Sequence, residues 1–352
     1  MDLLEETRPT TVTPSTPDGP EDRPRSVVTR LPTSDRVFRG VARVAGSAVL
    51  VIMLLVGLFL SAQAWPAVRK AGWGFLTTQD WDTEGNHFGV AGVLVGTILI
   101  ALVAITIALP LAIGTALYIS EYAPRRIAPF LVNLVDLMAA VPSVVYGIWG
   151  FFLLQPHLLV VGNQGEGLPR WLTTYFGWIP LLSVDEYQPR DPEASASRLT
   201  SSTFIAGIVV AMMVTPIIAS VMREVFAQAP PGEREGAYAL GATKWGMIRS
   251  VVMPFGRGGM IGATMLGLGR ALGETIGVVL IISIGFVIQP HILQNGGGSI
   301  SALIASRYQE STAIGVAALM GAGLVLFAMT LVVNLLAGVI ISRSRSGASS
   351  EA

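Results

Sequence analysis

Two ionisable side chains lie four residues apart inside a long apolar run, in the segment 269–275, which reads GRALGET. At this spacing on a helix, Arg270 and Glu274 share one face and can pair. A lone charge inside an apolar helix of membrane length is costly, so both side chains should face the protein interior or a wet cavity. One interpretation is a structural ion pair that fixes the helix register; the other is a route for an ionic substrate.

The residue types favour an anionic substrate on the second interpretation. The planar fork of Arg270 can donate two hydrogen bonds together to a tetrahedral oxyanion. A nearby carboxylate, from Glu274 or from Asp136 in another apolar run, could accept a hydrogen bond from an anion that retains a proton, such as hydrogen phosphate. It would repel one without a proton, such as sulfate. We therefore expect Arg270 with Glu274 or Asp136 to discriminate between oxyanions.

A second signal is a charged, helix-capable segment, 233–254, between two long apolar stretches. Helix-forming residues run to Leu240, and Gly241 is a natural helix stop because glycine tolerates positive φ. Thr243 can cap a second helix through Val252, which Pro254 should end or kink. The segment mixes apolar and cationic side chains, namely Ala237, Leu240, Trp245, Ile248, Val251 and Val252 with Arg234, Lys244 and Arg249. Its apolar residues must pack on the membrane domain or enter a partner's groove.

The elements that position these residues are membrane helices. The chain has 352 residues, of which 52% are hydrophobic and 13% charged, too apolar a balance for an ordinary soluble domain. Continuous apolar runs exclude the alternation of a membrane barrel. Six runs are long enough to span a bilayer: 43–63, 91–119, 130–155, 204–226, 260–289 and 313–341. The sequence predicts an all-α membrane protein with six transmembrane helices.

The distribution of Lys and Arg predicts the orientation. Of the 23 basic residues, sixteen lie in the two termini, at 125–126 and in loop 223–259, six lie in the other loops, and Arg270 lies inside a predicted span. Cytoplasmic loops carry the excess of Lys and Arg, so both termini should be cytoplasmic. Ala62-Gln63-Ala64 resembles a signal-peptidase site, but the apolar run before it and the polar stretch at the start are both long for a secretory signal. We expect no cleavage there.

Other motifs are absent from the sequence. There is no cysteine, and the three histidines are isolated, so no metal site is expected. Neither lysine belongs to a phosphate-binding P-loop, and no serine-hydrolase or zinc-protease motif is present. We therefore expect no enzymatic activity, no cofactor and no nucleic-acid partner, and ATP could act only through another subunit.

The segment at 233–254 resembles the cytoplasmic loop of the permease subunits of ABC importers. That loop reads Glu-Ala-Ala, three residues, Gly, nine residues, Ile, any residue, Leu, Pro. The matching residues are Glu235, Gly236, Ala237, Gly241, Val251, Met253 and Pro254. Gly236 departs from the usual Ala and should weaken the first helix by about 1 kcal/mol at most.

Four further segments resemble the phosphate-specific branch of that family, the PstC-type permeases. They are ALYISEYAP at 116–124, VPSVVYG at 141–147, ALGAT at 239–243 and GRALGET at 269–275. The resemblance spans about 90 to 290, most of the membrane domain. It is more specific than the loop motif alone.

The resemblance implies an ABC importer type I (MetI-like) permease fold in the cell membrane of a prokaryote. It implies a second homologous permease subunit, a pair of cytoplasmic ATP-binding subunits and an extracytoplasmic phosphate-binding protein. It assigns Arg270 and Glu274 to translocation. ATPase coupling is assigned to Glu235, Gly236, Ala237, Gly241 and Pro254.

We therefore expect a disordered cytoplasmic tail at 1–36, a permease domain at 37–345 with a coupling loop at 227–258, and a short cytoplasmic tail at 346–352. The expected function is the permease subunit of an ATP-driven importer of inorganic phosphate. A permease for sulfate or molybdate is one alternative. A stand-alone secondary transporter is another, although it would need no coupling loop.

Overall fold

The computed structural model describes residues 33–82, 85, 87–159, 167–185 and 198–344. Helix α1 (Thr33–Ala71) begins inside the tail expected at 1–36; the rest of that tail and 346–352 lie outside the described residues. The chain divides into two compact units, Met1–Met53 and Leu54–Ala352. The described part of the first unit is the exposed N-terminal stretch of α1, and all the other described elements belong to the second unit.

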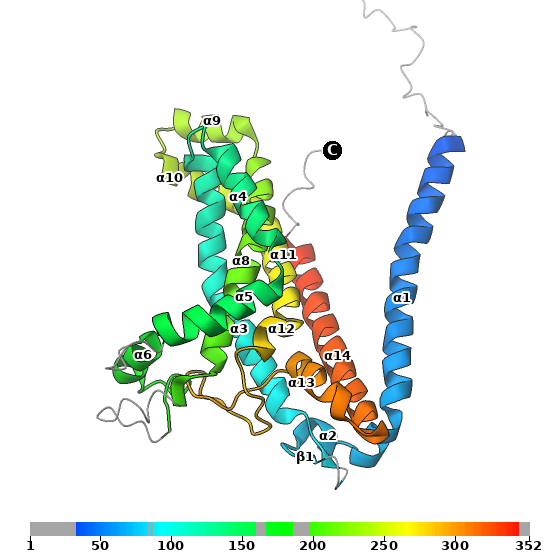
Figure 1. The fold of residues 1–352 in the computed structure, drawn as a ribbon. Helices are drawn as coiled ribbons and strands as arrows, with labels where there is room; N and C mark the ends of the chain where they lie inside the picture. The colour runs from blue at the N-terminus through cyan, green and yellow to red at the C-terminus, as the bar shows by residue number, and fades with distance from the viewer. Residues whose placement is uncertain (1–32, 83–84, 86, 160–166, 186–197, 345–352) are drawn as a thin grey trace, which may run out of the picture. The chain divides into compact units, whose positions relative to one another are not determined.

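Helices account for most of the described chain, with one short two-stranded antiparallel pair (Figure 1). The elements up to the end of the third predicted span are α2 (Gly74–Thr77), β1 (Trp81–Asp82), β2 (His87–Phe88), α3 (Ala91–Leu117), a π-helical turn η1 (Tyr118–Tyr122), α4 (Ala128–Ala140), α5 (Ser143–Trp149) and a π-helical segment η2 (Gly150–Leu159). The later elements are α6 (Leu168–Phe176), α8 (Thr203–Ala227), α9 (Pro231–Ala239), α10 (Lys244–Met247), a π-helical turn η3 (Ile248–Val252), α11 (Met253–Leu272), α12 (Ile276–Val279), α13 (Ile300–Arg307), a 3-10 turn η4 (Tyr308–Glu310) and α14 (Ala313–Ser344).

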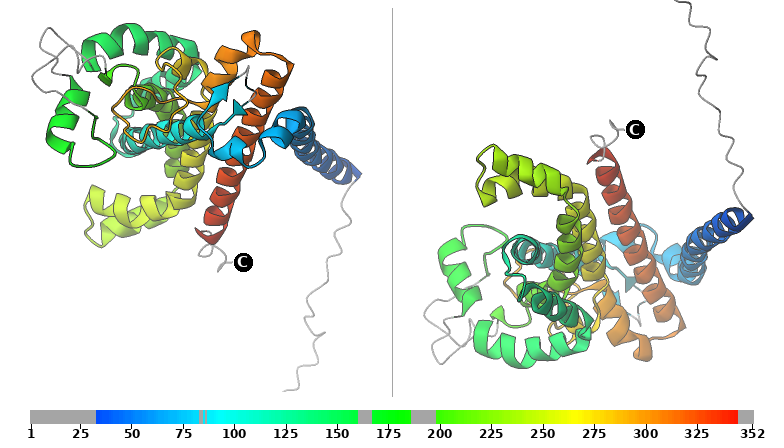
Figure 2. Two further views of the ribbon diagram at one scale, coloured as in Figure 1. Left: turned by 90° about the horizontal axis from the view of Figure 1, so that it is seen from below. Right: turned by 90° about the horizontal axis from the view of Figure 1, so that it is seen from above.

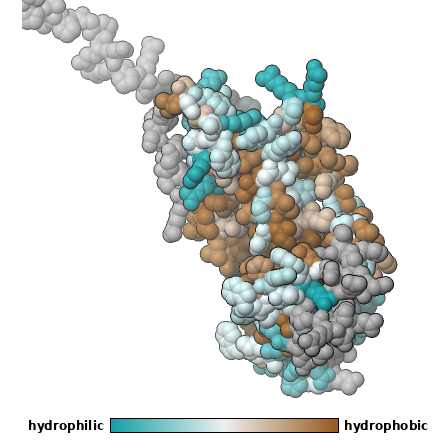
Figure 3. All heavy atoms as spheres, turned by 90° about the vertical axis from the view of Figure 1, so that its left-hand side faces the viewer, coloured by the Kyte–Doolittle hydropathy of each residue, from teal (hydrophilic) through white to brown (hydrophobic). Residues whose placement is uncertain are grey.

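Five described helices are long and apolar enough to cross a membrane, and a bent pair raises the number to six if it counts as one span. The space-filling view shows the expected hydrophobic band between two more hydrophilic ends (Figure 3). The two panels of Figure 2 look onto opposite ends of the second unit: the view from above (right panel) faces the end that carries α9, and the view from below (left panel) faces the end that carries α13. The prediction of a multi-pass helical membrane protein is therefore confirmed.

The third predicted span, 130–155, is broken. Helices α4 and α5 meet at a bend of 88°. Pro142 disfavours helical backbone at the residue before it, and Val141 is extended, with ψ 130°. The phenol of Tyr146 donates a hydrogen bond to the carbonyl of Met138 at 2.9 Å, across the bend. A proline signal inside an apolar run thus overrides the continuous hydrophobicity of the segment.

The fifth predicted span, 260–289, is displaced towards the N-terminus. The membrane-length helix runs from Lys244 to Leu272, and α12 is a separate short helix. Beyond α12 the described chain forms turns and irregular backbone, with one isolated β-bridge at Asn295, until α13 begins at Ile300. The predicted C-terminal half of this span is therefore wrong, with a direct consequence for Glu274.

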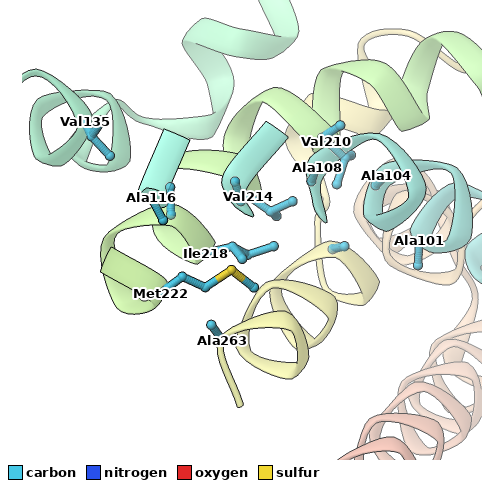
Figure 4. Close-up of a cluster of buried hydrophobic side chains, with 14 of the residues drawn as sticks. Ala101, Ala104, Ala108, Ala116, Val135, Val210, Val214, Ile218, Met222 and Ala263 are labelled. Carbon is cyan, nitrogen blue, oxygen red and sulfur yellow. The ribbon is translucent and has the colours of Figure 1, made fainter. Parts of the chain in front are cut away.

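The core of the second unit lies where α3, α8 and α11 pack together (Figure 4). Alanines on α3, such as Ala104 and Ala108, face larger side chains on α8, such as Val214 and Ile218. The methyl groups let the two backbones approach, as small residues do in membrane helix pairs. Gly267 completes the packing on α11, because a Cβ there would lie 2.4 Å from Ile218 Cδ1.

Candidate functional site

A groove of about 520 Å³ lies among α8, α11 and α14. It is near the middle of α8, at Ile217, and its lining combines apolar walls with a cation and two neutral polar side chains. The lining residues are Ile217, Met265, Leu266, Gly269, Arg270, Thr330 and Asn334. The volume would hold a small tetrahedral anion with several waters, since a water occupies about 30 Å³ in the liquid.

Arg270 is the charge in this groove, and its side chain is exposed in the second unit. Within the described part of the chain, no carboxylate forms an ion pair with Arg270, and no hydrogen bond involves its guanidinium. It lies in the last turn of α11, where a cation complements the partial negative charge of a helix end. The guanidinium is therefore free to bind an anion.

Glu274 does not pair with Arg270, and the expectation of a shared helix face is wrong. Helix α11 ends at Leu272, so the spacing rule for helices no longer applies. The Glu274 side chain is 7% exposed, and its Oε1 accepts a hydrogen bond from the backbone N–H of Gly277 at 3.1 Å. Its backbone carbonyl accepts a hydrogen bond from the hydroxyl of Ser301 at 2.6 Å. Glu274 therefore organises the turn between α11 and α12.

Asp136 is also outside the groove lining. It lies on α4, and its Oδ1 accepts a hydrogen bond from the Ser220 hydroxyl of α8 at 2.5 Å. Ser220 is one turn along α8 from Ile217, which lines the groove. Asp136 therefore contacts α8, one of the helices that line the groove, but does not pair with Arg270. Its role in translocation stays a prediction.

A larger cavity, of about 600 Å³, lies between α1 and the start of α14. Its lining includes the polar side chains of Gln63 and Tyr308 and no charged residue. Such a lining cannot balance the charge of a buried anion. The smaller groove is therefore the better candidate for an ionic substrate.

The second candidate site is the coupling loop. Gly241 has φ +83°, and its N–H donates to the carbonyl of Tyr238 while the N–H of Ala242 donates to that of Ala237. This pair of bonds is the Schellman motif that glycine permits at a helix end. The hydroxyl of Thr243 accepts a hydrogen bond from the N–H of Gly246 at 3.1 Å. Both predicted signals, the glycine stop and the threonine cap, are therefore confirmed.

Pro254 does not end the second helix, which was one of the two outcomes expected of it. The chain passes from α10 through the π-helical turn η3 into α11, and the whole stretch from Lys244 to Leu272 is one membrane-length helix. Pro254 is the second residue of α11. The wider turn of η3 precedes it directly.

The apolar residues of the coupling loop separate into two sets. Ile248 and Val252 are 0% exposed and pack in the core. Leu240, Tyr238 and Trp245 are 91%, 45% and 56% exposed. The first set anchors the loop on the membrane domain, and the second set is available to a partner.

The predicted coupling residues at the start of the loop lie on α9. Glu235 and Gly236 are exposed, whereas Ala237 is half-buried and packs against the core. Their positions leave Glu235 and Gly236 accessible to another subunit. Their role in coupling stays a prediction, as does that of Gly241 and Pro254.

An ion pair that the sequence analysis missed ties the coupling loop to two membrane helices. Arg234 Nη1 donates to Glu121 Oε2 at 3.1 Å and lies 3.0 Å from Oε1, and Nη2 donates to the Phe226 carbonyl at 2.6 Å. The Glu121 side chain is 4% exposed and that of Arg234 22%. Arg234 therefore joins α9 to η1, at the end of α3, and to the end of α8. The two residues are 113 positions apart, so no local spacing rule could have found the pair.

A second contact lies beside this ion pair. The ammonium group of Lys244, at the start of α10, lies 4.7 Å from the ring centroid of Tyr122. This is within the range of a cation–π interaction. Both contacts involve residues of the π-helical turn η1 (Tyr118–Tyr122), so η1 contacts both α9 and α10.

Comparison with known proteins places the chain in a family. The model of the family described as binding-protein-dependent transport system inner membrane component matches residues 108–346. The phosphate transport system permease protein PstC 2 of Mycobacterium tuberculosis is 38% identical over 305 residues, covering 85% of this chain and 89% of the relative. The PstC protein of Haemophilus influenzae is 36% identical over 304 residues, covering 84% and 90%.

A solved structure supports the fold. A bacterial ABC transporter involved in the import of the acidic polysaccharide alginate matches with a TM-score of 0.50 at 16% sequence identity, covering 88% of this chain and 99% of that chain. At this identity the likeness concerns the fold alone. It confirms the expected fold of an ABC-transporter membrane subunit.

Proposed function

The chain belongs to the inner membrane components of binding-protein-dependent transport systems, and we propose that it is the permease subunit of an ATP-driven importer of inorganic phosphate. The observation that carries the substrate class is the exposed Arg270 in a membrane-depth groove, with no partner among the described residues. An unpaired intramembrane cation marks an anion pathway more readily than a structural role. We assign phosphate as the specific anion because the relatives are phosphate transport system permease proteins.

Family membership implies an ATPase and a substrate-binding protein as partners. We propose the finer composition of a second homologous permease that closes the groove, a pair of cytoplasmic ATP-binding subunits and an extracytoplasmic phosphate-binding protein. The exposed Tyr238, Leu240 and Trp245 offer the ATPases an apolar surface. Tyrosine and tryptophan are enriched among the residues that contribute most of the binding energy at protein interfaces.

The mechanism follows from the contacts of the coupling loop. ATP binding would draw the ATPase subunits together and displace α9. Because Arg234 bonds to Glu121 and to the Phe226 carbonyl, the displacement reaches the ends of α3 and α8. The stretch from Lys244 to Leu272 is continuous, so the same movement also reaches Arg270. The groove would thereby alternate between outward and inward access.

The proposed orientation has both termini and the coupling loop in the cytoplasm, following the excess of basic residues there. Single cysteines introduced into this cysteine-free chain at Gly241 and at Trp178 would report it through a membrane-impermeant thiol reagent. In intact cells, the reagent should label the second position and leave the first unlabelled. Labelling of Gly241→Cys with Trp178→Cys left unlabelled would show that the chain has the opposite orientation.

The transport proposal is tested with the complete complex in vesicles, measuring uptake of radiolabelled phosphate. We expect uptake that requires ATP and the binding protein and that arsenate inhibits far more than sulfate or molybdate does. Inhibition by sulfate or molybdate alone would instead support a permease for that oxyanion. Uptake by this single chain in ATP-free vesicles would support a secondary transporter.

A further inference from the structure

Asn334 is an exposed amide in an apolar stretch of α14. Its exposed neighbours along the helix include Val332, Leu335 and Leu336, and its side chain makes no hydrogen bond with any described residue. An amide facing lipid without a partner would cost several kcal/mol by transfer scales, about 4 or more into a non-bonding solvent. Asn334 therefore needs a polar environment, and the groove that it shares with Arg270 provides one.

Thr330 lines the same groove and lies four residues before Asn334 on α14, so the two side chains share a helix face. The Thr330 hydroxyl donates its hydrogen to the carbonyl of Phe327 at 2.9 Å. Its oxygen is left to act as an acceptor. The groove thus has neutral acceptors on α14 and a cationic donor on α11.

This combination suits an oxyanion that retains a proton. A guanidinium can only donate hydrogen bonds, so it satisfies the charged oxygens and leaves a P–OH group without an acceptor. The carboxylates expected to serve as acceptors are engaged elsewhere, Glu274 with Gly277 and Asp136 with Ser220. A neutral acceptor can receive the P–OH proton and does not repel the anion.

Building on the proposed phosphate transport, we propose that Asn334, supported by Thr330, is a specificity-determining residue for the translocated anion. The Asn334 carbonyl oxygen accepts the P–OH hydrogen bond while Arg270 binds the unprotonated oxygens. The amide N–H₂ can donate to another oxygen of the same anion. An unprotonated oxyanion such as sulfate would leave the acceptors of α14 unmatched.

The test uses the complete complex in vesicles, with uptake of radiolabelled phosphate measured at saturating binding protein and ATP hydrolysis measured in parallel. Asn334→Leu removes the acceptor and keeps the shape roughly constant, and Thr330→Val does the same for the weaker partner. We expect phosphate moved per ATP hydrolysed to fall about tenfold or more for Asn334→Leu, as for losing a hydrogen bond to a charged ligand, and to fall less for Thr330→Val. Asn334→Ser should recover part of the loss because it restores an acceptor.

Asn133→Leu is the matched control, since Asn133 is also an exposed asparagine on a membrane helix, α4, and does not line the groove. We expect its uptake to equal that of the unmodified complex. Uptake within twofold of normal for Asn334→Leu would overturn the proposal. So would loss of co-purification of the second permease, which would make Asn334 an assembly residue. If the unmodified complex moves no phosphate, the proposed function itself fails, a result that does not depend on Asn334.

Discussion

The arginine of the coupling loop and the arginine of the groove differ in their partners. Arg234 in the coupling loop bonds to a carboxylate and to a backbone carbonyl. Arg270 in the groove has no such partner among the described residues. A paired arginine holds two elements in a fixed relation, whereas an unpaired one in an apolar region keeps its binding capacity for a ligand. On the proposed mechanism, the paired Arg234 would transmit movement and the unpaired Arg270 would contact the substrate.

The sharpest way to break this comparison is to remove the unpaired charge. Arg270→Leu should reduce phosphate uptake by about a hundredfold, because about 3 kcal/mol of charge-assisted hydrogen bonding to the anion is lost. Arg270→Lys should retain part of the uptake because it keeps the charge without the planar fork. Uptake assays on the purified complex measure both. Normal uptake by Arg270→Leu would remove Arg270 from the anion route.

Removing the paired charge should give a different defect. Glu121→Gln leaves the guanidinium of Arg234 without its counter-charge, and breaking such a pair costs about 3 kcal/mol where it is well buried. We expect a lower thermal stability and a fall in transport of about tenfold, while the complex still hydrolyses ATP. The ratio of phosphate moved to ATP hydrolysed is the measurement.

The charge-reversed pair, Glu121→Arg with Arg234→Glu, provides the control for that experiment. It should restore part of the ratio, because the attraction between α9 and η1 is re-formed with opposite polarity. If the double variant is no better than the single ones, the two residues do not act as a pair.

Leu240 and Ile248 are two side chains of equal size in the coupling loop, one exposed and one buried, and their truncation should give different defects. Leu240→Ala should weaken binding of the ATPase subunits by about 1–2 kcal/mol and leave this chain's own stability unchanged, since Leu240 is 91% exposed. Ile248→Ala should lower stability by about 2–5 kcal/mol, because it empties a buried site. Affinity of the ATPase for the detergent-solubilised permease and thermal unfolding distinguish the two. A destabilised Leu240→Ala would show that Leu240 is packed within the chain.

Effects as small as that of Leu240→Ala, or smaller, are expected at Gly241. No heavy atom lies within 4 Å of a Cβ built there, so only the φ of +83° penalises a side chain. Gly241→Val should disturb the corner by about 1–2 kcal/mol, and Gly241→Asn less, because asparagine tolerates this conformation. ATPase binding is again the measurement. Equal effects from the two variants would mean that size, rather than backbone conformation, matters.

Local signals in the sequence predicted the parts of the fold that depend on neighbouring residues. The glycine stop and the Thr243 cap follow from rules that act within one helical turn. The span boundaries followed from hydrophobicity, except where Pro142 broke one run and where α11 ended early. In both exceptions the hydrophobic window was continuous and the backbone was not.

The candidate site was predictable only in part. Arg270 was found because a lone cation in an apolar run is informative by itself. The predicted pairing of Arg270 with Glu274 was wrong, because the rule for residues four apart assumes an unbroken helix. Asn334 carries a comparable signal as an amide in an apolar helix and was overlooked beside the charged residues. The Arg234–Glu121 pair depends on tertiary packing between distant segments, which composition and spacing do not encode.

The π-helical turn η3 sets the rotational phase of everything that follows it. A π turn contains one residue more than an α turn, and one residue corresponds to about 100° around a helix axis. If the same five residues of η3 formed a regular α-helix instead, α11 would be rotated by about that angle relative to the coupling loop. Arg270 would then point away from α14, although every residue of the groove would still be present. The π turn thus sets the register between the exposed residues of the coupling loop and the face of α11 on which Arg270 lines the groove.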